Sequence, residues 1–207
     1  MSFPILSALI LLPSIGAIFL LFSKDKNSNT AKYVALFTSF VNFLISIYLW
    51  YIFDSSTSAF QFVENREWLN GLANYKVGID GISILFIILT TFITPLCIIS
   101  VNNTIKIRLR DFLIAILIME SLMIGVFCSL DLVVFYLFFE AGLIPMFLII
   151  GIWGGDRRVY SAFKFFLYTL LGSVLMLVAI ISIYWIVGTT DIVKLYALGI
   201  DIKYQNL

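Results

Sequence analysis

The chain has 207 residues, of which 62% are hydrophobic and only 12% are charged. A soluble domain is about 45–50% apolar and about 25% charged, and a chain of this size cannot hide so much apolar surface inside a globule. The 13 Lys and Arg residues balance 12 Asp and Glu residues, which excludes a basic surface for nucleic acid, and the absence of histidine excludes bis-histidine haem and Ser-His catalysis. The composition therefore predicts a protein whose solvent is lipid.

Apolar runs long enough to cross a bilayer recur along the chain, since a hydrocarbon core about 30 Å thick needs roughly 20 apolar residues per helix. The longest interruption is a polar stretch at 54–78, and a short turn at 129–131 separates the fourth run from the fifth. Backbone groups in lipid must be hydrogen-bonded internally, so each run is expected to be an α-helix. The prediction is an all-α, polytopic membrane protein with six transmembrane helices, at 3–22, 33–53, 79–101, 112–130, 132–153 and 160–187.

Lys and Arg residues are distributed unevenly between the helix connections, and this predicts an orientation. Nine of the 13 fall on one side, eight in the connections after the first, third and fifth helices and Lys164 just inside the sixth helix, and four fall on the other side. We expect the side with nine to face the cytoplasm or the mitochondrial matrix, with both termini opposite. We also expect three parts: helices one to three within 1–111, helices four to six at 112–187, and an interfacial tail at 188–207.

Three ionisable residues fall inside the predicted spans, namely Glu120, Glu140 and Lys164. A charge at the bilayer centre costs at least ~2.5–3.5 kcal/mol, so each one is a candidate functional residue. At about 1.5 Å per residue from the turn at Asp131, the two glutamates lie roughly 16 and 14 Å deep on neighbouring helices. At least one of two nearby carboxyls is then expected to hold a proton near neutral pH, as a proton relay requires.

Each of these candidates also has a purely structural interpretation. Pro145 removes a helix hydrogen bond one turn after Glu140 and, with Gly142, favours a kink there, as in helices that line ion pathways. Glu140 could instead be a hydrogen-bonded structural acid, and Glu120 a protonated group that holds helices four and five together. Lys164 could extend its amine to the interface. Asp131, in the outer turn, is expected to cap the fifth helix.

The fifth helix and its surroundings resemble a known family. The motif F-E-x-x-L-I-P-M at 139–146, the loop Trp-Gly-Gly-Asp-Arg-Arg at 153–158 and the segment Val-Gly-Ile-Asp-Gly-Ile-Ser at 77–83 are similar to the antiporter-like membrane subunits of respiratory complex I. The cation/proton antiporter subunits are paralogues with the same pattern. The resemblance extends over the whole chain and implies the start of an antiporter-like inverted-repeat fold.

The resemblance implies a subunit of a proton-pumping membrane arm, in a bacterial or mitochondrial inner membrane. Glu140 would then be a proton-pathway residue, and Glu120 and Lys164, by their positions within the spans, are the further candidates for the same path. The subunit would have no cofactor and no metal, would bind neither NADH nor quinone directly, and would have other membrane-arm subunits and the lipid bilayer as its partners, with no nucleic acid. Whether such a chain counts as an enzyme depends on the complex, because no complete catalytic site is expected in it alone.

Members of this family continue beyond six helices and carry a lysine on a broken seventh helix, which is missing here. We therefore expect the chain to be a truncated N-terminal portion. Two other functions stay open at this point: a cation/proton antiporter subunit of the same fold, and a non-catalytic membrane fragment. Dependence of transport on NADH would distinguish the first from a complex I subunit.

Overall fold

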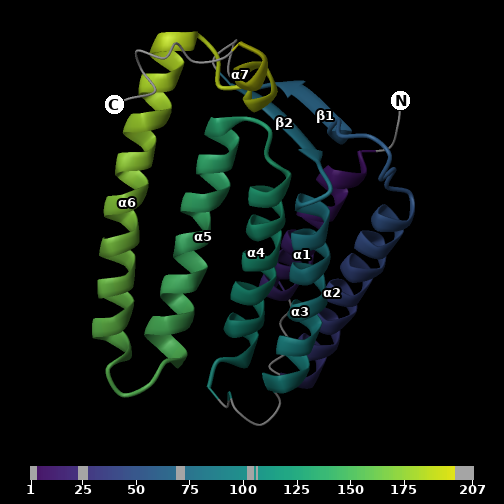
Figure 1. Cartoon of the computed structure of the whole chain (residues 1–207). Helices are drawn as coiled ribbons and strands as arrows, with labels where there is room; N and C mark the ends of the chain where they lie inside the picture. Colours follow the sequence, from purple (N-terminus) through teal and green to yellow (C-terminus); the bar gives the residue numbers. More distant parts are fainter. Residues whose placement is uncertain (1–3, 23–27, 69–72, 102–104, 106, 199–207) are drawn as a thin grey trace.

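The computed structural model describes residues 4–22, 28–68, 73–101, 105 and 107–198. Figure 1 shows long helices side by side, with a small sheet and a short helix gathered at one end. Six of the helices are long and apolar enough to cross a membrane. They are α1 (Ile5–Phe22), α2 (Ser28–Tyr51), α3 (Ser83–Ser100), α4 (Leu109–Cys128), α5 (Leu132–Trp153) and α6 (Arg158–Val187), and the short helix is α7 (Ile192–Leu198).

The six predicted spans are confirmed, and α5 has the predicted bounds. The other boundaries differ by a few residues, because polar residues can continue a helix beyond its apolar run, as at the start of α2, and because Ile79 ends a strand instead of starting α3. Thus α2 begins five residues before the predicted start at Tyr33, and α3 begins at Ser83 instead of Ile79. Of the predicted tail at 188–207, residues 199–207 lie outside the described part of the chain, as do Lys24, Lys26, Lys106 and Lys203 of the orientation argument.

The polar stretch before α3 contains a feature that the all-α prediction missed. Strands β1 (Gln61–Glu67) and β2 (Asn74–Ile79) pair in antiparallel register, with a shift between Gln61 and Glu64. Their alternation of apolar and polar residues is weak, so hydropathy alone gave no strand signal. The hairpin lies across one end of the helices, as Figure 1 shows, and it brings the end of β2 directly to the start of α3. We call this the outer end and the opposite one the inner end, as labels only.

Helix α4 lies at the centre of the packing, in contact with α1, α2, α3 and α5, whereas α6 packs mainly against α5. In the most apolar stretch of each helix, 56% of the residues are buried in α4 but only 11% in α6. Gly125 permits the close approach of α5, because a Cβ atom there would come within 2.5 Å of the Phe138 ring. The molecule therefore consists of a closed bundle, α1–α4, and an open layer, α5 and α6.

The closed bundle contains two apolar clusters, one toward each end. The outer cluster includes Leu9, Leu49 and Ile124, and the inner cluster includes Ala17, Ala35 and Leu117. Between them, at the middle of the helices, lies a band of buried or half-buried polar side chains that we call the polar layer: Ser14, Asn42, Ser46, Thr91, Glu120 and Ser121. The two cysteines are both free thiols in different environments, since Cys128 is buried and Cys97 is exposed.

Candidate functional site

Glu140 lies near the middle of α5, where its side chain is half-buried. Its Oε2 atom is buried and has no hydrogen-bond partner among the described residues. Helix α5 is continuous through Pro145, which is itself buried. A carboxyl that retains a free buried oxygen at the middle of a spanning helix can accept or release a proton there, provided that a second group or water reaches it.

The turn of helix after Glu140 borders two apolar cavities. One, of about 250 Å³, lies where α4, α5 and α6 meet, and Gly142 and Leu143 are part of its wall. The other, of about 540 Å³, extends from Ala141 past Phe138 to Tyr75 of β2. A Cβ atom added to Gly142 would meet no atom within 4 Å. Glu140 itself lines neither cavity, but neighbouring residues of α5 line both.

Glu120 has a different environment from the one that sequence spacing suggested. Only 2% of it is exposed, and its Oε1 accepts a hydrogen bond of 2.9 Å from Nδ2 of Asn42 on α2. The face of α4 toward α5 instead carries Leu122 and Met123. Helices α4 and α5 are neighbours as predicted, but the hydrogen bond of Glu120 joins α4 to α2. Asn42, a polar residue within an apolar span, was the overlooked signal in the sequence.

The rest of the polar layer is hydrogen-bonded between helices. The Ser46 and Thr91 hydroxyls are 2.7 Å apart and join α2 to α3. Ser14 donates to Ser121 over 2.8 Å, and Ser121 donates in turn to the backbone oxygen of Ile10. Every helix of the closed bundle therefore contributes to this layer, which lies inside the bundle except at Ser14 and Ser121, where it borders a pocket between α1, β1 and α5.

Lys164, the third candidate, lies on an exposed part of α6. Its Nζ is 6.0 Å from the ring centroid of Tyr160, one turn earlier. This is the outer limit of a cation–π contact. The position, in the second turn of α6, is compatible with both predicted interpretations, a contribution to proton transfer and an amine that extends to the interface.

At the outer end, the turn between α4 and α5 is held between two segments that are distant in sequence. Leu130 donates its N–H to the Lys76 oxygen on β2, while Ile192 donates to the Leu130 oxygen and Leu132 donates to the Thr190 oxygen. Isolated bridges pair Val77 with Ser129 and Asp131 with Asp191. We call this arrangement of β2, residues 129–132 and residues 190–192 the outer joint.

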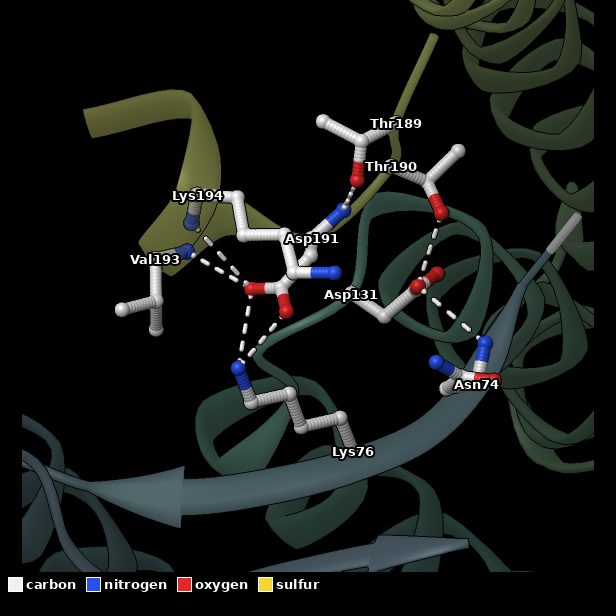
Figure 2. Close-up of polar contacts among 8 residues, drawn as sticks. All are labelled: Asn74, Lys76, Asp131, Thr189, Thr190, Asp191, Val193 and Lys194. Carbon is white, nitrogen blue, oxygen red and sulfur yellow. Dashed lines mark hydrogen bonds and ion pairs between the residues drawn. The ribbon is translucent and has the colours of Figure 1, made fainter. Parts of the chain in front are cut away.

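Two aspartates organise the outer joint (Figure 2). Asp131 accepts hydrogen bonds from the N–H groups of Val133 and Val134, which confirms its predicted role as the cap of α5, and it also accepts from the Thr190 hydroxyl at 2.7 Å. Asp191 pairs with Lys76, whose Nζ lies 2.9 and 2.7 Å from its two carboxylate oxygens. The Lys76–Asp191 pair links positions 115 residues apart, so no local pattern in the sequence could identify it.

The hairpin also closes over the start of α1. Glu64 accepts hydrogen bonds from the first N–H groups of α1, at 2.8 Å from Leu6, and from the Ser7 hydroxyl. These are the unpaired donors of a helix N-terminus, where a carboxylate is favourable. The Ser7 hydroxyl in turn lies 3.0 Å from the Tyr75 hydroxyl, and burial raises the pKa of Tyr75. The outer end is thus a structural cap, whereas the ionisable groups of the spans lie below it.

Residues 129–206 match the family described as NADH:quinone oxidoreductase/Mrp antiporter, TM. This region includes Glu140 and Lys164 but not Glu120. Among curated proteins, the chain is 57% identical over 183 residues to NADH-quinone oxidoreductase subunit M of Rhodobacter capsulatus, covering 88% of this chain and 34% of that protein. It is 50% identical over 189 residues to NADH-ubiquinone oxidoreductase chain 4 of Arabidopsis thaliana, covering 90% of this chain and 38% of that one.

The fold has a match of the same kind. A chain in the structure titled "Respiratory complex I from Thermus thermophilus with bound NADH" superposes with a TM-score of 0.80 at 28% identity, over 95% of this chain and 40% of that chain. The chain therefore spans between a third and about two fifths of the length of these proteins. The α5 motif pointed to the antiporter-like subunits in general, and the relatives reported above are named subunit M and chain 4.

Proposed function

Because the chain belongs to the antiporter-like membrane subunits of NADH:quinone oxidoreductase, we propose that it contributes to redox-coupled proton translocation in the membrane arm of such a complex. In this function Glu140 is the carboxyl that receives and passes on a proton within the membrane. The chain itself transfers no electrons. NADH oxidation and quinone reduction take place in other subunits and act on this one through its packing and its electrostatics.

One observation carries the proposal: Glu140 combines the family's motif with a free buried carboxylate oxygen. Its Oε2 has no partner in the described part of the chain, and neighbouring residues of α5 line two apolar cavities. A carboxyl already saturated with hydrogen bonds would have to break them to exchange its proton, whereas Glu140 keeps one oxygen available. The adjacent Pro145 leaves the Ala141 oxygen without its usual helix donor, which supplies a second acceptor nearby.

Lys164 has a supporting part in this proposal. It lies on α6, in the second turn from the inner end, within the region that matches the family. An ammonium group there favours the ionised form of acids on the inner side of the path. We propose that it facilitates proton entry from this side, and that replacing it with Gln reduces coupled activity less than replacing Glu140 does.

The proposed setting is a bacterial or mitochondrial inner membrane, with other membrane-arm subunits as partners. Figure 1 supports one orientation, since the connection between α5 and α6 lies at the opposite end from the hairpin and α7. Arg157 and Arg158 belong to the end that we assign to the cytoplasm or matrix, by the excess of positive charge in its connections. Exposed apolar side chains along α6, such as Leu167 at 60% and Leu175 at 65%, supply a face for lipid or for a neighbouring helix.

The test is Glu140→Gln, introduced in the full-length gene and assayed in membrane vesicles. We expect NADH oxidation coupled to proton uptake to be abolished, because glutamine preserves the shape and cannot release a proton. NADH oxidation with an artificial electron acceptor should persist, since it needs only an assembled complex. Glu67→Gln is the matched control, as it makes the same chemical change at an exposed strand residue. Near-normal coupled activity in Glu140→Gln would refute the role.

A cation/proton antiporter subunit is the second candidate, because the description of the matching family includes Mrp antiporters. The same vesicles distinguish the two functions. If transport requires NADH and stops with inhibitors of quinone reduction, the subunit acts in the oxidoreductase. If an imposed sodium or potassium gradient drives proton movement without NADH, the antiporter function is correct.

A further inference from the structure

The contact between Glu120 and Asn42 leaves two oxygen atoms unexplained. Asn42 is fully buried and Glu120 is 2% exposed, and one hydrogen bond of 2.9 Å joins them, from Asn42 Nδ2 to Glu120 Oε1. The other oxygen of each side chain, Asn42 Oδ1 and Glu120 Oε2, is buried without a partner in the part of the chain that the structure describes. Two unpaired acceptors on adjoining side chains would cost about 1–3 kcal/mol each.

Among the described residues, no Lys or Arg forms an ion pair with Glu120. Helices α1 and α3 contain no Asp, Glu, Lys or Arg, and the only charged residue of α5 is Glu140. Lys32 of α2 and Arg110 of α4 each lie ten residues from the contact along their helices, or about 15 Å. Lys76 of β2 is paired with Asp191 at the outer joint. The remaining titratable groups on these elements are Asp111, which lies beside Arg110 at the start of α4, and Tyr and Cys side chains, so none of them is a cation.

An ionised carboxyl accepts hydrogen bonds only, so ionised Glu120 cannot satisfy Asn42 Oδ1. A protonated carboxyl has an O–H donor, which removes both defects with a single proton and also removes the uncompensated buried charge. We propose that Glu120 is a proton-binding site, occupied at neutral pH, in which the proton on Oε2 is donated to Asn42 Oδ1. The acid and the amide then form two reciprocal hydrogen bonds that clamp α4 to α2.

The pair of Glu120 and Asn42 is part of the polar layer, which lies between the two apolar clusters of the closed bundle. Above and below it the bundle is apolar, so the proton comes from water while the bundle is open, and it is retained once α1–α4 have packed. Glu120 thereby differs from Glu140: its proton stabilises the bundle, and its second oxygen faces an amide instead of a free path. This inference stands on the contacts of α2 and α4 and does not require the proposed function.

Infrared spectroscopy of the full-length protein in lipid at neutral pH tests the proton directly. The wild-type spectrum minus the Glu120→Gln spectrum should contain a carboxylic-acid C=O band that shifts in deuterated water, and the Glu140→Gln variant should retain that band. In Asn42→Leu the band should move to higher frequency, because the C=O loses the amide donor. Carboxylate bands in the difference spectrum would overturn the proposal, and a band that Asn42→Leu leaves unmoved would overturn the pairing.

Thermal unfolding supplies an independent readout that does not depend on NADH oxidation. Glutamine at position 120 retains a donor and an acceptor for Asn42, so Glu120→Gln should keep a midpoint close to that of the wild type. Glu120→Leu leaves the amide unpaired and should lower the midpoint by several degrees, and adding Asn42→Leu should restore part of the loss, as coupled partners do. A Glu120→Gln protein as unstable as Glu120→Leu would contradict the reciprocal pair.

Discussion

The closed bundle α1–α4 and the open layer α5–α6 each place one glutamate within a membrane-spanning helix, in opposite surroundings. Glu120 is enclosed by helices and bonded to an amide, while Glu140 is half-buried beside cavities on a helix of which only 17% of the spanning stretch is buried. A carboxyl in the first setting is suited to holding a proton, because its surroundings are packed. The second setting leaves access for exchange, so burial alone does not identify a proton-path residue; its accessibility matters as much.

The largest expected effect contrasts the two glutamates. Glu140→Gln should abolish coupled NADH oxidation in vesicles, and Glu120→Gln should cause a milder loss, because only the first residue is proposed to exchange protons during turnover. Proton uptake and NADH oxidation, measured on equal amounts of assembled complex, check this. An equal loss in both variants would mean that the two carboxyls act as a pair, and the contrast between the regions would fail.

The outer joint is the next place to test, because it fastens the open layer to the hairpin. Asp131→Ala removes the cap of α5 together with the hydrogen bond that Asp131 accepts from the buried Thr190 hydroxyl. We expect a loss of about 2 kcal/mol in the free energy of unfolding, from the lost cap and the lost hydrogen bond. Asp131→Asn, which retains one acceptor for the cap, should lose less. Equal stability of the wild type and Asp131→Ala would show that the joint does not contribute.

Two glycines, Gly125 of α4 and Gly142 of α5, provide a matched comparison between a tightly packed and an unfilled position. Gly125→Ala places a methyl group against the Phe138 ring and should cost about 1–3 kcal/mol, whereas Gly142→Ala enters open space and should be neutral or stabilising by up to about 1 kcal/mol. Thermal midpoints in lipid measure both. If Gly142→Ala lowers the yield of assembled complex while the isolated chain stays stable, a neighbouring subunit covers this face of α5.

The smallest effect is expected at the start of α3. Burial raises the pKa of Asp80, but hydrogen bonds from Ser83 and from backbone N–H groups outweigh burial and hold this pKa below the ordinary range. The ionised form is therefore favoured by folding, so its stabilisation is present above the ordinary pKa of about 3.9 and is lost as the pH falls below it. After solvent screening we expect Asp80→Ala to cost about 0.5 kcal/mol at pH 7 and less in acid. A cost that does not depend on pH would contradict this assignment.

The helices could be predicted from the sequence because lipid imposes a single rule on them, a long apolar run with internal hydrogen bonds. That rule does not extend to the polar stretch before α3, so the hairpin and Glu64 at the start of α1 were missed. It also cannot specify which helix faces which. Position along a helix estimated the depth of Glu120 and Glu140, but the Asn42 partner depends on the rotation of α4 against α2, which only packing determines.

The cap role of Asp131 was predictable for the opposite reason, since a cap depends on residues two and three positions away. Lys76 and Asp191 lie on segments whose proximity depends on the entire path of α3 to α6, and no local pattern reports it. Lys164 remains a prediction: its exposure on α6 agrees with a residue that meets lipid, water or another subunit.

The outer joint has a mechanical consequence for the open layer. Backbone hydrogen bonds join residues 130–132 to residues 190–192, so the chain leaves the joint along α5, turns at the inner end and returns along α6 to the same place. The pair of helices is therefore a long closed loop with its two outer ends locked together and to β2. A force on the connection between α5 and α6 would therefore tilt both helices together about the outer joint, and Glu140, which lies between the joint and that connection, would move with them.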